Sequence, residues 1–578
     1  MNLTEDILQA AFISLVVATF LLNTCRALKA IEICKECLIF LNKKMVELEG
    51  ESFNLLYMRI YRTIFRAYCL IGDPTEALIY GRKLLEIYCQ CGKKDDEGDP
   101  TILLVFDCLF FSMEKSESLR SFLGNNDYLK VLCSDLSGYS YRKLSMLFCS
   151  FGNPNHGLYV LELGRARALA DLMSSQYSVE SQISADPQSW TGIENIMKKE
   201  SNSSCLYVSY NAHDLFFWVL KTSGTIHFRR ITVDEKLVGA GLVGKFDDVL
   251  AKCFRSLGIL GDQECEDRSL SGVQSLAVPR LIEEDDEEIQ NSEWNLPLYY
   301  RILISPVADL LEEPEIIVVP DRSLNQVPFA ALTDERGRYL SETLRIRIVP
   351  SLTTLKLIQD SRAFYHSQRG ALIVGDPDVG TVYYKGKAMS WSRLPCAGNE
   401  AVMIGQLLSV QPLLGPQATK LVVLEMLHTV SLIHFAANGN AERGEIALSP
   451  VRPRNSIPKE EDYLLTMSDI AQVQLQARLV VLSCCHSGRG QITAEGVIGI
   501  ARAFLGSGAR SVLVALWAIR DEATEQLMRR FYEHLVCGET ASESLHQAMK
   551  WMRGNGFGTV YDWAPFMLIG DNVTFDLK

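Results

Sequence analysis

The residues that decide the fold of this chain are Leu479 to Gly490, which read LVVLSCCHSGRG. An apolar run, Leu479–Leu482, ends abruptly in Ser483-Cys484-Cys485-His486 and continues into a turn rich in serine and glycine. A short apolar run bounded by turn residues is typical of a buried strand. Open α/β sheets carry ligands and catalytic groups at the carboxyl ends of their strands. The sequence therefore predicts a thiol at such a strand end.

A second strand of the same kind lies upstream. Ser431–Gly439 reads SLIHFAANG, and its polar end, Asn438, precedes Cys485 by 47 residues. In caspases, the histidine of the catalytic pair precedes the nucleophilic cysteine by about 50 residues. The spacing therefore predicts a core like that of a cysteine protease. The residue type differs, because an asparagine stands where the spacing places a histidine.

In the last two-thirds of the chain, strand-like runs alternate with helical patterns. The strand-like runs begin at Cys205, Leu215, Thr225, Ile316, Gly370, Ser431, Leu479 and Ser511. The helical patterns cover Glu400–Leu408, Lys420–Leu427, Val497–Leu505 and Glu522–Leu535. Helices that alternate with almost wholly apolar strands predict a parallel sheet covered on both faces.

The first third of the chain contains an internal repeat. Residues 68–82, YCLIGDPTEALIYGR, align with residues 148–162, FCSFGNPNHGLYVLE. Each copy predicts a helix, a turn and a second helix that starts after the proline and carries a small residue where helices approach closely. Ala27–Leu41 is a third, weaker second-helix pattern, and Leu158–Met173 predicts one strong helix in which Gly164 is the only helix-breaking residue. The repeat resembles a loosely spaced tetratricopeptide repeat, and an unrelated helical domain is the alternative.

Composition narrows the classes of protein and partner. The chain has 578 residues, 48% hydrophobic and 22% charged, as in an ordinary globular protein. Its net charge of −13 argues against nucleic acid as a partner. Sixteen cysteines without regular spacing are typical of reduced thiols, so we expect a cytoplasmic protein. Cys34 and Cys37 form a lone CxxC pattern, and because closed zinc sites need four ligands, we expect no metal and no cofactor.

Two segments have alternative interpretations. Ile7–Leu22 is almost wholly apolar but has no positive flank and, at 16 residues, is just short of a bilayer span. It predicts a buried helix, and a membrane segment is the alternative. Glu283–Glu288 is a run of six acids that predicts a solvated loop. Binding of a basic partner, or cleavage in this loop, is the alternative there.

The C-terminal two-thirds of the chain resembles a CHAT domain, the caspase-like module found attached to tetratricopeptide repeats. The resemblance covers about residues 140–575. Its motifs are GRARAL at Gly164–Leu169, VPDRSLNQVPFAAL at Val319–Leu332, IHFAANG at Ile433–Gly439, LSCCHSG at Leu482–Gly488, GVIGIARAF at Gly496–Phe504 and ALWAIRDEAT at Ala515–Thr524. The resemblance implies an α/β caspase-like domain with a parallel sheet, preceded by an all-α helical repeat region.

In that family the working pair is a histidine in an Ala-Thr/Ala-His-Gly turn and a cysteine in a Ser-Ala/Cys-Cys turn. Transferred by motif, Cys485 is the nucleophile position and Asn438 is the histidine position. A thiol of pKa near 8.5 is only a few per cent thiolate at neutral pH, and a neighbouring imidazole lowers that pKa and later protonates the leaving amine. An asparagine amide does not titrate, although it can hold a substrate by a hydrogen bond.

No other histidine is a convincing replacement. His434 lies four residues before Asn438 on the same strand, roughly 13 Å away at about 3.3 Å per residue, and we expect it in the core. His486 is adjacent to Cys485, and neighbouring side chains usually diverge. The resemblance further implies an oxyanion hole at the backbone N–H groups of Gly439 and Cys485. It also implies that Asp521 lines the first specificity pocket and favours a basic residue before the cleaved bond; a helix N-cap is the alternative role for Asp521.

These observations divide the chain into a degenerate or truncated helical region with TPR-like repeats (1–175), a linker or helix (176–203) and a CHAT domain (204–578) with an acidic insertion around 260–297. We expect a protein-interaction or scaffold module that binds protein partners through its helical repeats and has an impaired protease-like site. The alternative is an active caspase- or separase-like cysteine endopeptidase with a peptide substrate. We expect neither a nucleic-acid nor a membrane partner.

Overall fold

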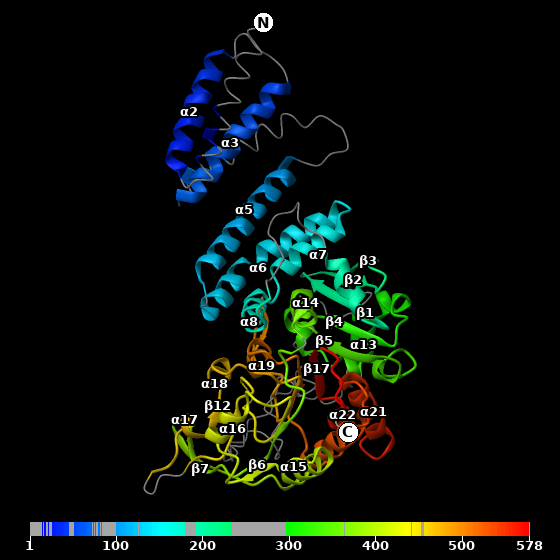
Figure 1. The fold of residues 1–578 in the computed structure, drawn as a ribbon. Helices are drawn as coiled ribbons and strands as arrows, with labels where there is room; N and C mark the ends of the chain where they lie inside the picture. The colour runs from blue at the N-terminus through cyan, green and yellow to red at the C-terminus, as the bar shows by residue number, and fades with distance from the viewer. Residues whose placement is uncertain are drawn as a thin grey trace, which may run out of the picture. The chain divides into compact units, whose positions relative to one another are not determined.

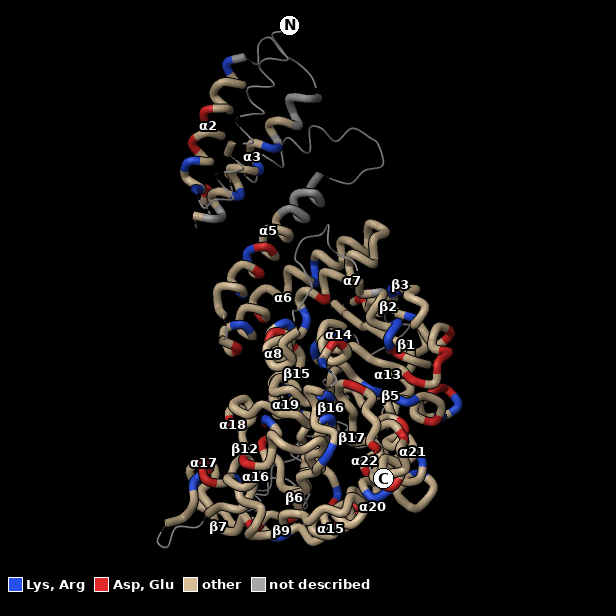
Figure 2. The backbone as a smooth tube through the Cα atoms, in the orientation of Figure 1, with Lys and Arg blue, Asp and Glu red and all other residues tan. Residues whose placement is uncertain are grey.

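The computed structural model divides the chain into two compact units, Met1–Leu119 and Arg120–Lys578. The described residues are scattered positions among 14–83 and the continuous stretches 26–44, 51–71, 100–124, 126–179, 192–211, 213–233, 296–362, 364–440, 442–451 and 456–576. The expected boundary near residue 175 lies inside the second unit. Most of Ile7–Leu22, most of the helix expected after Pro74 and the acidic run Glu283–Glu288 lie outside the described residues. Figure 2 shows Lys and Arg interspersed with Asp and Glu along both units.

The first unit is built from helices. α2 (Ala27–Lys44) and α3 (Glu51–Ile71) lie side by side (Figure 1) and share an apolar core, and α5 (Pro100–Phe122) follows them. Cys34 and Cys37 are both buried in this core, and burial raises the pKa of Cys34 to about 12. Such thiols are poor metal ligands, and the described residues contain no cluster with the composition of a metal site. Of the helices that the described residues form, none combines the length and the apolar content that a bilayer span requires.

The second unit opens with the helical hairpin that the repeat predicts. α6 (Asp127–Ser150) ends at the Gly-Asn turn, and Pro154 is the first residue of α7 (Pro154–Leu163). Gly157 is the small residue expected in the second helix: a Cβ there would lie 3.0 Å from the carbonyl oxygen of Ser145. The small residue therefore allows α6 and α7 to pack closely.

The prediction of a single helix over Leu158–Met173 is wrong. α7 ends at Leu163, and α8 (Arg167–Tyr177) starts only after Ala166, whose φ is 49°. Two contacts stabilise this break between the helices. A Cβ on Gly164 would lie 2.8 Å from the ring of Tyr141, and the Arg165 guanidinium turns inward to pair with Asp321 at 3.3 Å.

An eleven-stranded sheet forms the centre of the second unit, in the order β3-β2-β1-β4-β5-β17-β16-β13-β10-β6-β9. Most neighbouring strands are parallel; β2 is antiparallel to β1 and β3, and β17 is antiparallel to β16. The strands are β1 (Ser203–Tyr210), β2 (Asp214–Leu220), β3 (Ile226–Thr232), β4 (Glu315–Val319), β5 (Arg345–Ile348), β6 (Ala371–Pro377), β9 (Leu413–Gly415), β10 (Leu432–Ala436), β13 (Leu479–Ser483), β16 (Ser511–Ala515) and β17 (Phe566–Gly570). The eight predicted strands are all present, and β5, β9 and β17 were not predicted.

Three two-stranded sheets are attached to this centre: β7 (Gly380–Tyr384) with β8 (Lys387–Trp391), β11 (Ile446–Ala447) with β12 (Leu464–Leu465), and β14 (Gln491–Thr493) with β15 (Gly496–Ile498). The predicted helix Val497–Leu505 is wrong in its first residues, because Val497 and Ile498 belong to β15 and α19 (Ile500–Gly506) begins after them. Gly499 between them approaches the Arg489 backbone so closely that a Cβ would lie 2.1 Å from its carbonyl oxygen.

Helices cover both faces of the sheet (Figure 1), so alternate residues of its strands enter two different cores. Val481 and Cys485 pack on the face covered by α15 (Pro395–Leu408), α20 (Asp521–Val536) and α21 (Ala541–Gly554). Val480 and Cys484 pack on the face covered by α8, α14 (Leu352–Asp360), α16 (Lys420–Met426) and α19. The remaining helices are α9 (Ile193–Ile196), α13 (Leu296–Leu303), α17 (Glu460–Tyr463), α18 (Met467–Ala471), α22 (Val560–Trp563) and the 3-10 turns η3 (Met197–Lys199), η5 (Ser305–Leu310), η6 (Arg322–Gln326), η7 (Phe329–Ala331) and η8 (Leu340–Glu342).

Candidate active site

Cys485 follows β13 directly, at the carboxyl edge of the sheet, and its thiol is closed off from solvent. The side chain is fully buried. Its Sγ accepts a hydrogen bond from the backbone N–H of Ile519 at 3.3 Å and lies 3.8 Å from the Ile519 carbonyl oxygen. Ile519 belongs to the segment between β16 and α20. This segment therefore covers the group that a substrate would have to reach.

The two strand ends singled out in the sequence meet at this edge. β10 and β13 are parallel neighbours, with Ala436 paired to Ser483. Gly439 lies directly against the Cys485 backbone, since a Cβ on Gly439 would be 2.3 Å from the Cys485 carbonyl oxygen. Asn438 is buried, and its carbonyl oxygen accepts from the N–H of Ala447 at 2.9 Å. The structure thus brings Gly439 and Cys485 into contact and places Asn438 at the adjoining position of β10's end.

His434 is held inside the core, as expected. Its Nε2 lies 2.9 Å from a carboxylate oxygen of Glu400, and its Nδ1 lies 3.0 Å from the hydroxyl of Tyr532. All three side chains are fully buried. Both ring nitrogens therefore face side chains of the helices α15 and α20, away from the strand end.

His486 is neutral and strained. Its φ is 58°, its side chain is buried, and its backbone N–H donates to the Trp517 carbonyl oxygen at 3.3 Å. Burial, with a smaller effect of the Arg489 charge, lowers the pKa of His486 to about 3. A group with that pKa is a weak base toward a thiol of ordinary pKa near 8.5.

Asp521 is not the N-cap of its helix, so that alternative is wrong. Arg520 is the N-cap of α20, and Asp521 is the first helical residue. Its carboxylate instead accepts from the N–H of Cys396, in the first turn of α15, at 3.0 Å. The contact places a negative charge at the amino end of a neighbouring helix, where the helix dipole stabilises it.

Two residues that sequence reasoning did not single out support this edge. The hydroxyl of Ser487 donates to the Leu482 carbonyl oxygen at 3.0 Å and accepts from the N–H of Ala515 at 2.8 Å, so it joins the Cys485 turn to β16. Asp376 at the end of β6 accepts from the N–H of Leu394 at 2.6 Å, next to the site where Asp521 binds α15. The Ser-Gly and Gly-Asp-Pro patterns at the strand ends were the available signals.

Comparisons with known proteins agree with the CHAT-like motifs of the sequence. The family profile of the CHAT domain matches residues 298–571. Tetratricopeptide repeat protein 28 from Homo sapiens and from Mus musculus are each 26% identical to this chain over 78% of its length, and the matched region is 22% and 23% of those proteins. The chain thus spans less than a quarter of the length of these relatives.

Two crystal structures of the Saccharomyces cerevisiae separase–securin complex are also similar. They are 10% and 11% identical in sequence, with TM-scores of 0.44 and 0.45, over 98% of this chain and 54% and 53% of theirs. The second unit has the mostly parallel, doubly covered sheet that the motifs implied, and an all-α region precedes it. Residues 298–571 of this chain match the CHAT domain, and the second unit has the α/β fold with a mostly parallel sheet that this resemblance implied.

Proposed function

We propose that this chain is a protein-interaction module whose CHAT domain keeps the form of a cysteine-peptidase site without its base. The observation that carries the proposal is Asn438 at the position of the family histidine. An amide can neither take the thiol proton nor return a proton to a leaving amine at neutral pH. Asn438 therefore supplies no titrating group at β10's end.

The surroundings of the thiol support this proposal. Ile519 covers Cys485, both ring nitrogens of His434 lie next to buried side chains, and burial lowers the pKa of His486 to about 3. None of these groups is available as a base without rearrangement. These surroundings of the thiol are best explained by an impaired catalytic site.

The helical region is the part that we propose binds protein partners. Helical repeats present extended surfaces that suit protein recognition, and the relatives named above carry the tetratricopeptide repeat in their name. A reducing, cytoplasmic location is part of the proposal, because no disulfide joins the cysteines of the described residues.

An active cysteine endopeptidase is the second candidate function. The feature that favours it is the intact turn around Cys485, with Ser487 tied to β16 and Gly439 against the Cys485 backbone. In that case a rearrangement must uncover the thiol and supply a base. Asp521 would then favour a basic residue before the cleaved bond.

A peptide-library cleavage assay on the full chain tests the proposal. We expect no cleavage by the wild type or by Cys485→Ala. Asn438→His restores an imidazole, and general-base catalysis contributes about 10²–10⁴-fold, so we expect measurable cleavage that Cys485→Ala abolishes. Asn438→Gln, which keeps an amide, is the matched control and should stay silent.

Cleavage by the wild-type chain that disappears in Cys485→Ala would overturn the proposal and establish the endopeptidase. The residue before each cut site would then test Asp521. Silence of Asn438→His, with the fold intact, would show that the cover over Cys485 blocks the site as well as the missing base.

A further inference from the structure

The turn that carries Cys485 continues into a hairpin that is closed at its root. The hairpin consists of β14 and β15, and Gly490 and Gly499 flank it. A Cβ on Gly490 would lie 2.3 Å from the Ile498 carbonyl oxygen, and one on Gly499 would lie 2.1 Å from the Arg489 carbonyl oxygen. The two strands therefore touch backbone to backbone five residues after Cys485, so a displacement of the hairpin is transmitted to the turn.

The tip of this hairpin is hydrogen-bonded to helices from the start of the second unit. The Glu495 side chain is buried; one carboxylate oxygen accepts from the Ser134 hydroxyl of α6 at 2.6 Å, and the other accepts from the N–H of Ala168 in the first turn of α8 at 2.9 Å. The neighbouring N–H of Ala494 donates to the Asp135 carboxylate at 2.6 Å. These three contacts join residues that are more than 320 positions apart in the sequence.

A second tether lies just beyond the hairpin. Arg502 of α19 makes two hydrogen bonds to the Asp127 carboxylate at the start of α6, at 2.8 and 2.9 Å, and its side chain is 5% exposed. Bidentate pairs of this kind hold both partners in a fixed orientation. α6 therefore contacts both the hairpin and the helix that follows it.

The turn itself is bonded to the segment that covers the thiol. The N–H of His486 donates to the Trp517 carbonyl oxygen at 3.3 Å, and the N–H of Gly488 donates to the Ala515 carbonyl oxygen at 2.8 Å. Ile519, which contacts Cys485 Sγ, lies two residues beyond Trp517. Contacts thus run without a break from α6 through the hairpin and the turn to the thiol's cover.

We infer that the β14–β15 hairpin is a latch by which α6 and α8 keep the Cys485 thiol covered, with Glu495 as the positioning residue. Release of Glu495 from Ser134 and Ala168 frees the hairpin, loosens the turn from β16 and exposes the thiol. The inference rests on the proposed function only in taking the helical region as the part that a partner binds. A partner that displaces α6 would open the site.

Alkylation of the full chain by iodoacetamide, with each cysteine followed by peptide mass spectrometry, tests the latch. Cys205 is fully buried in β1 and reports global unfolding, whereas the exposed Cys537 reports the intrinsic reaction rate. A buried thiol reacts only through opening. We expect Glu495→Gln to raise the Cys485 rate about tenfold relative to Cys205, the effect of losing one buried hydrogen bond.

Glu162→Gln is the matched control. Glu162 is also fully buried and also accepts from a helix start, at the N–H and hydroxyl of Thr353, both at 2.6 Å, but it does not touch the hairpin. We expect the ratio of the Cys485 and Cys205 rates to stay unchanged in this variant. Asp127→Asn, on a partly exposed residue, is a milder variant that weakens only the Arg502 tether and should raise the ratio about threefold.

Equal acceleration of Cys485 and Cys205, or the same rise in Glu162→Gln, would overturn the latch and leave Glu495 as an ordinary structural residue. No acceleration of Cys485 in either Glu495→Gln or Asp127→Asn would also overturn it. The assay needs no peptidase activity. Cleavage by the wild type would therefore contradict the proposed function without affecting the latch.

Discussion

At the scale of single residues, His486 shows how the Cys485 turn departs from relaxed geometry. Its φ of 58° is a conformation that costs a non-glycine residue roughly 1–2 kcal/mol. Its Nδ1 is buried with no hydrogen-bond partner in the described part of the chain. Backbone hydrogen bonds to the carbonyl oxygens of Trp517 and Ala515 hold the turn in this conformation.

The placement of Cys485 and Asn438 at two strand ends could be predicted from the sequence, because strand ends and residue spacing are local signals. The segment that covers the thiol could not be predicted from the sequence. It contains Ile519, which lies 34 residues beyond Cys485 and reaches it only after β13 and β16 have paired. Nothing in the apolar run Ala515–Ile519 indicates a hydrogen bond to sulfur.

Two buried histidines predict a loss of stability in acid. Burial lowers the pKa of His486 to about 3 and that of His366 to about 4, from an unfolded value near 6.5. Below pH 6.5 the unfolded chain therefore binds more protons than the folded chain, and the free energy of unfolding falls. We expect each histidine to remove about 2 kcal/mol between pH 7 and pH 5, measured by chemical denaturation.

His486→Gln keeps a polar side chain but does not titrate, so its free energy of unfolding should fall by about 2 kcal/mol less over this range. His213→Gln, at an exposed position, should keep the wild-type pH dependence. An unchanged pH dependence in His486→Gln would mean that the ring binds a proton as readily in the folded protein as in the unfolded chain.

At the scale of elements, the sequence predicted strands better than it predicted interruptions. The buried parallel strands have near-continuous apolar runs, which are strong signals. β5 was missed because its sequence, Arg-Ile-Arg-Ile, carries charges that find partners only after folding. The break between α7 and α8 was missed because it depends on Tyr141 and Asp321, both distant in sequence.

The amino end of α15 provides an element-scale prediction about Asp521. Leu394 is the N-cap of α15 and makes no side-chain capping bond, so Asp376 and Asp521 satisfy the N–H groups of Leu394 and Cys396 from outside. We expect Asp521→Ala to lower the free energy of unfolding by about 1 kcal/mol, as for a lost helix cap. Chemical denaturation measures this change.

Glu522→Ala is the matched control, because Glu522 lies in the same first turn of α20 but is exposed. Its change should stay within about 0.5 kcal/mol. If Asp521→Ala were equally silent, the bond to Cys396 would be energetically unimportant, and the carboxylate would remain available for a basic substrate residue.

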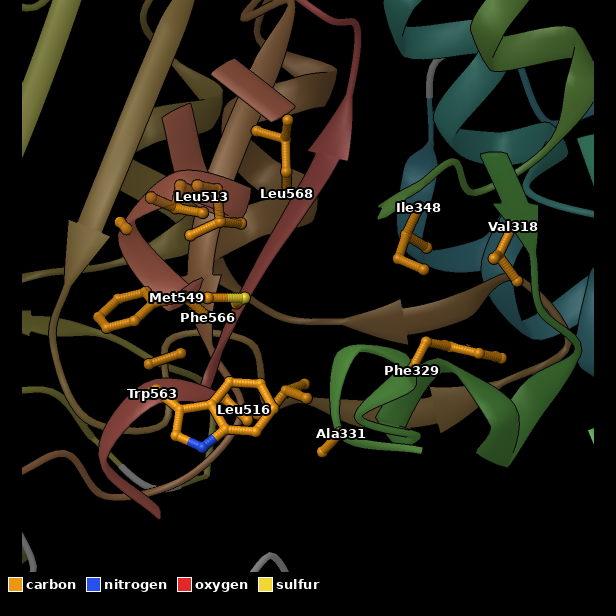
Figure 3. Close-up of a cluster of buried hydrophobic side chains, with 14 of the residues drawn as sticks. Val318, Phe329, Ala331, Ile348, Leu513, Leu516, Met549, Trp563, Phe566 and Leu568 are labelled. Carbon is orange, nitrogen blue, oxygen red and sulfur yellow. The ribbon is translucent and has the colours of Figure 1, made fainter. Parts of the chain in front are cut away.

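At the scale of the whole second unit, the sheet consists of two halves joined at a narrow seam. β5 and β17 pair at a single position, Ile348 with Ile569. Figure 3 shows Val318 and Ile348 on one side of this seam and Leu513 and Leu568 on the other. Few backbone hydrogen bonds therefore cross the seam, and interactions between side chains must supply most of its stability.

Arg347 is the side chain that we expect to contribute most at this seam. It is fully buried, forms ion pairs with Glu200 and, at 3.3 Å, with Glu315, and donates to the Gly570 carbonyl oxygen of β17 at 3.2 Å. Removal of one partner leaves buried charges uncompensated, which costs about 3–5 kcal/mol. Arg347→Met should lower the free energy of unfolding by that amount, and β17 amides should exchange faster than those of β13.

Arg345→Met is the matched control on the same strand, two residues away. Arg345 pairs with Glu543 at 2.7 Å, with both side chains about one-quarter exposed, so the pair is worth about 1 kcal/mol or less. If the two variants lost equal stability, the seam would be held by apolar packing alone. A larger loss of stability in Arg347→Met that is partly recovered by adding Glu200→Gln and Glu315→Gln would establish that one buried guanidinium joins the two halves. The added changes remove the charges that the loss of Arg347 leaves unpaired.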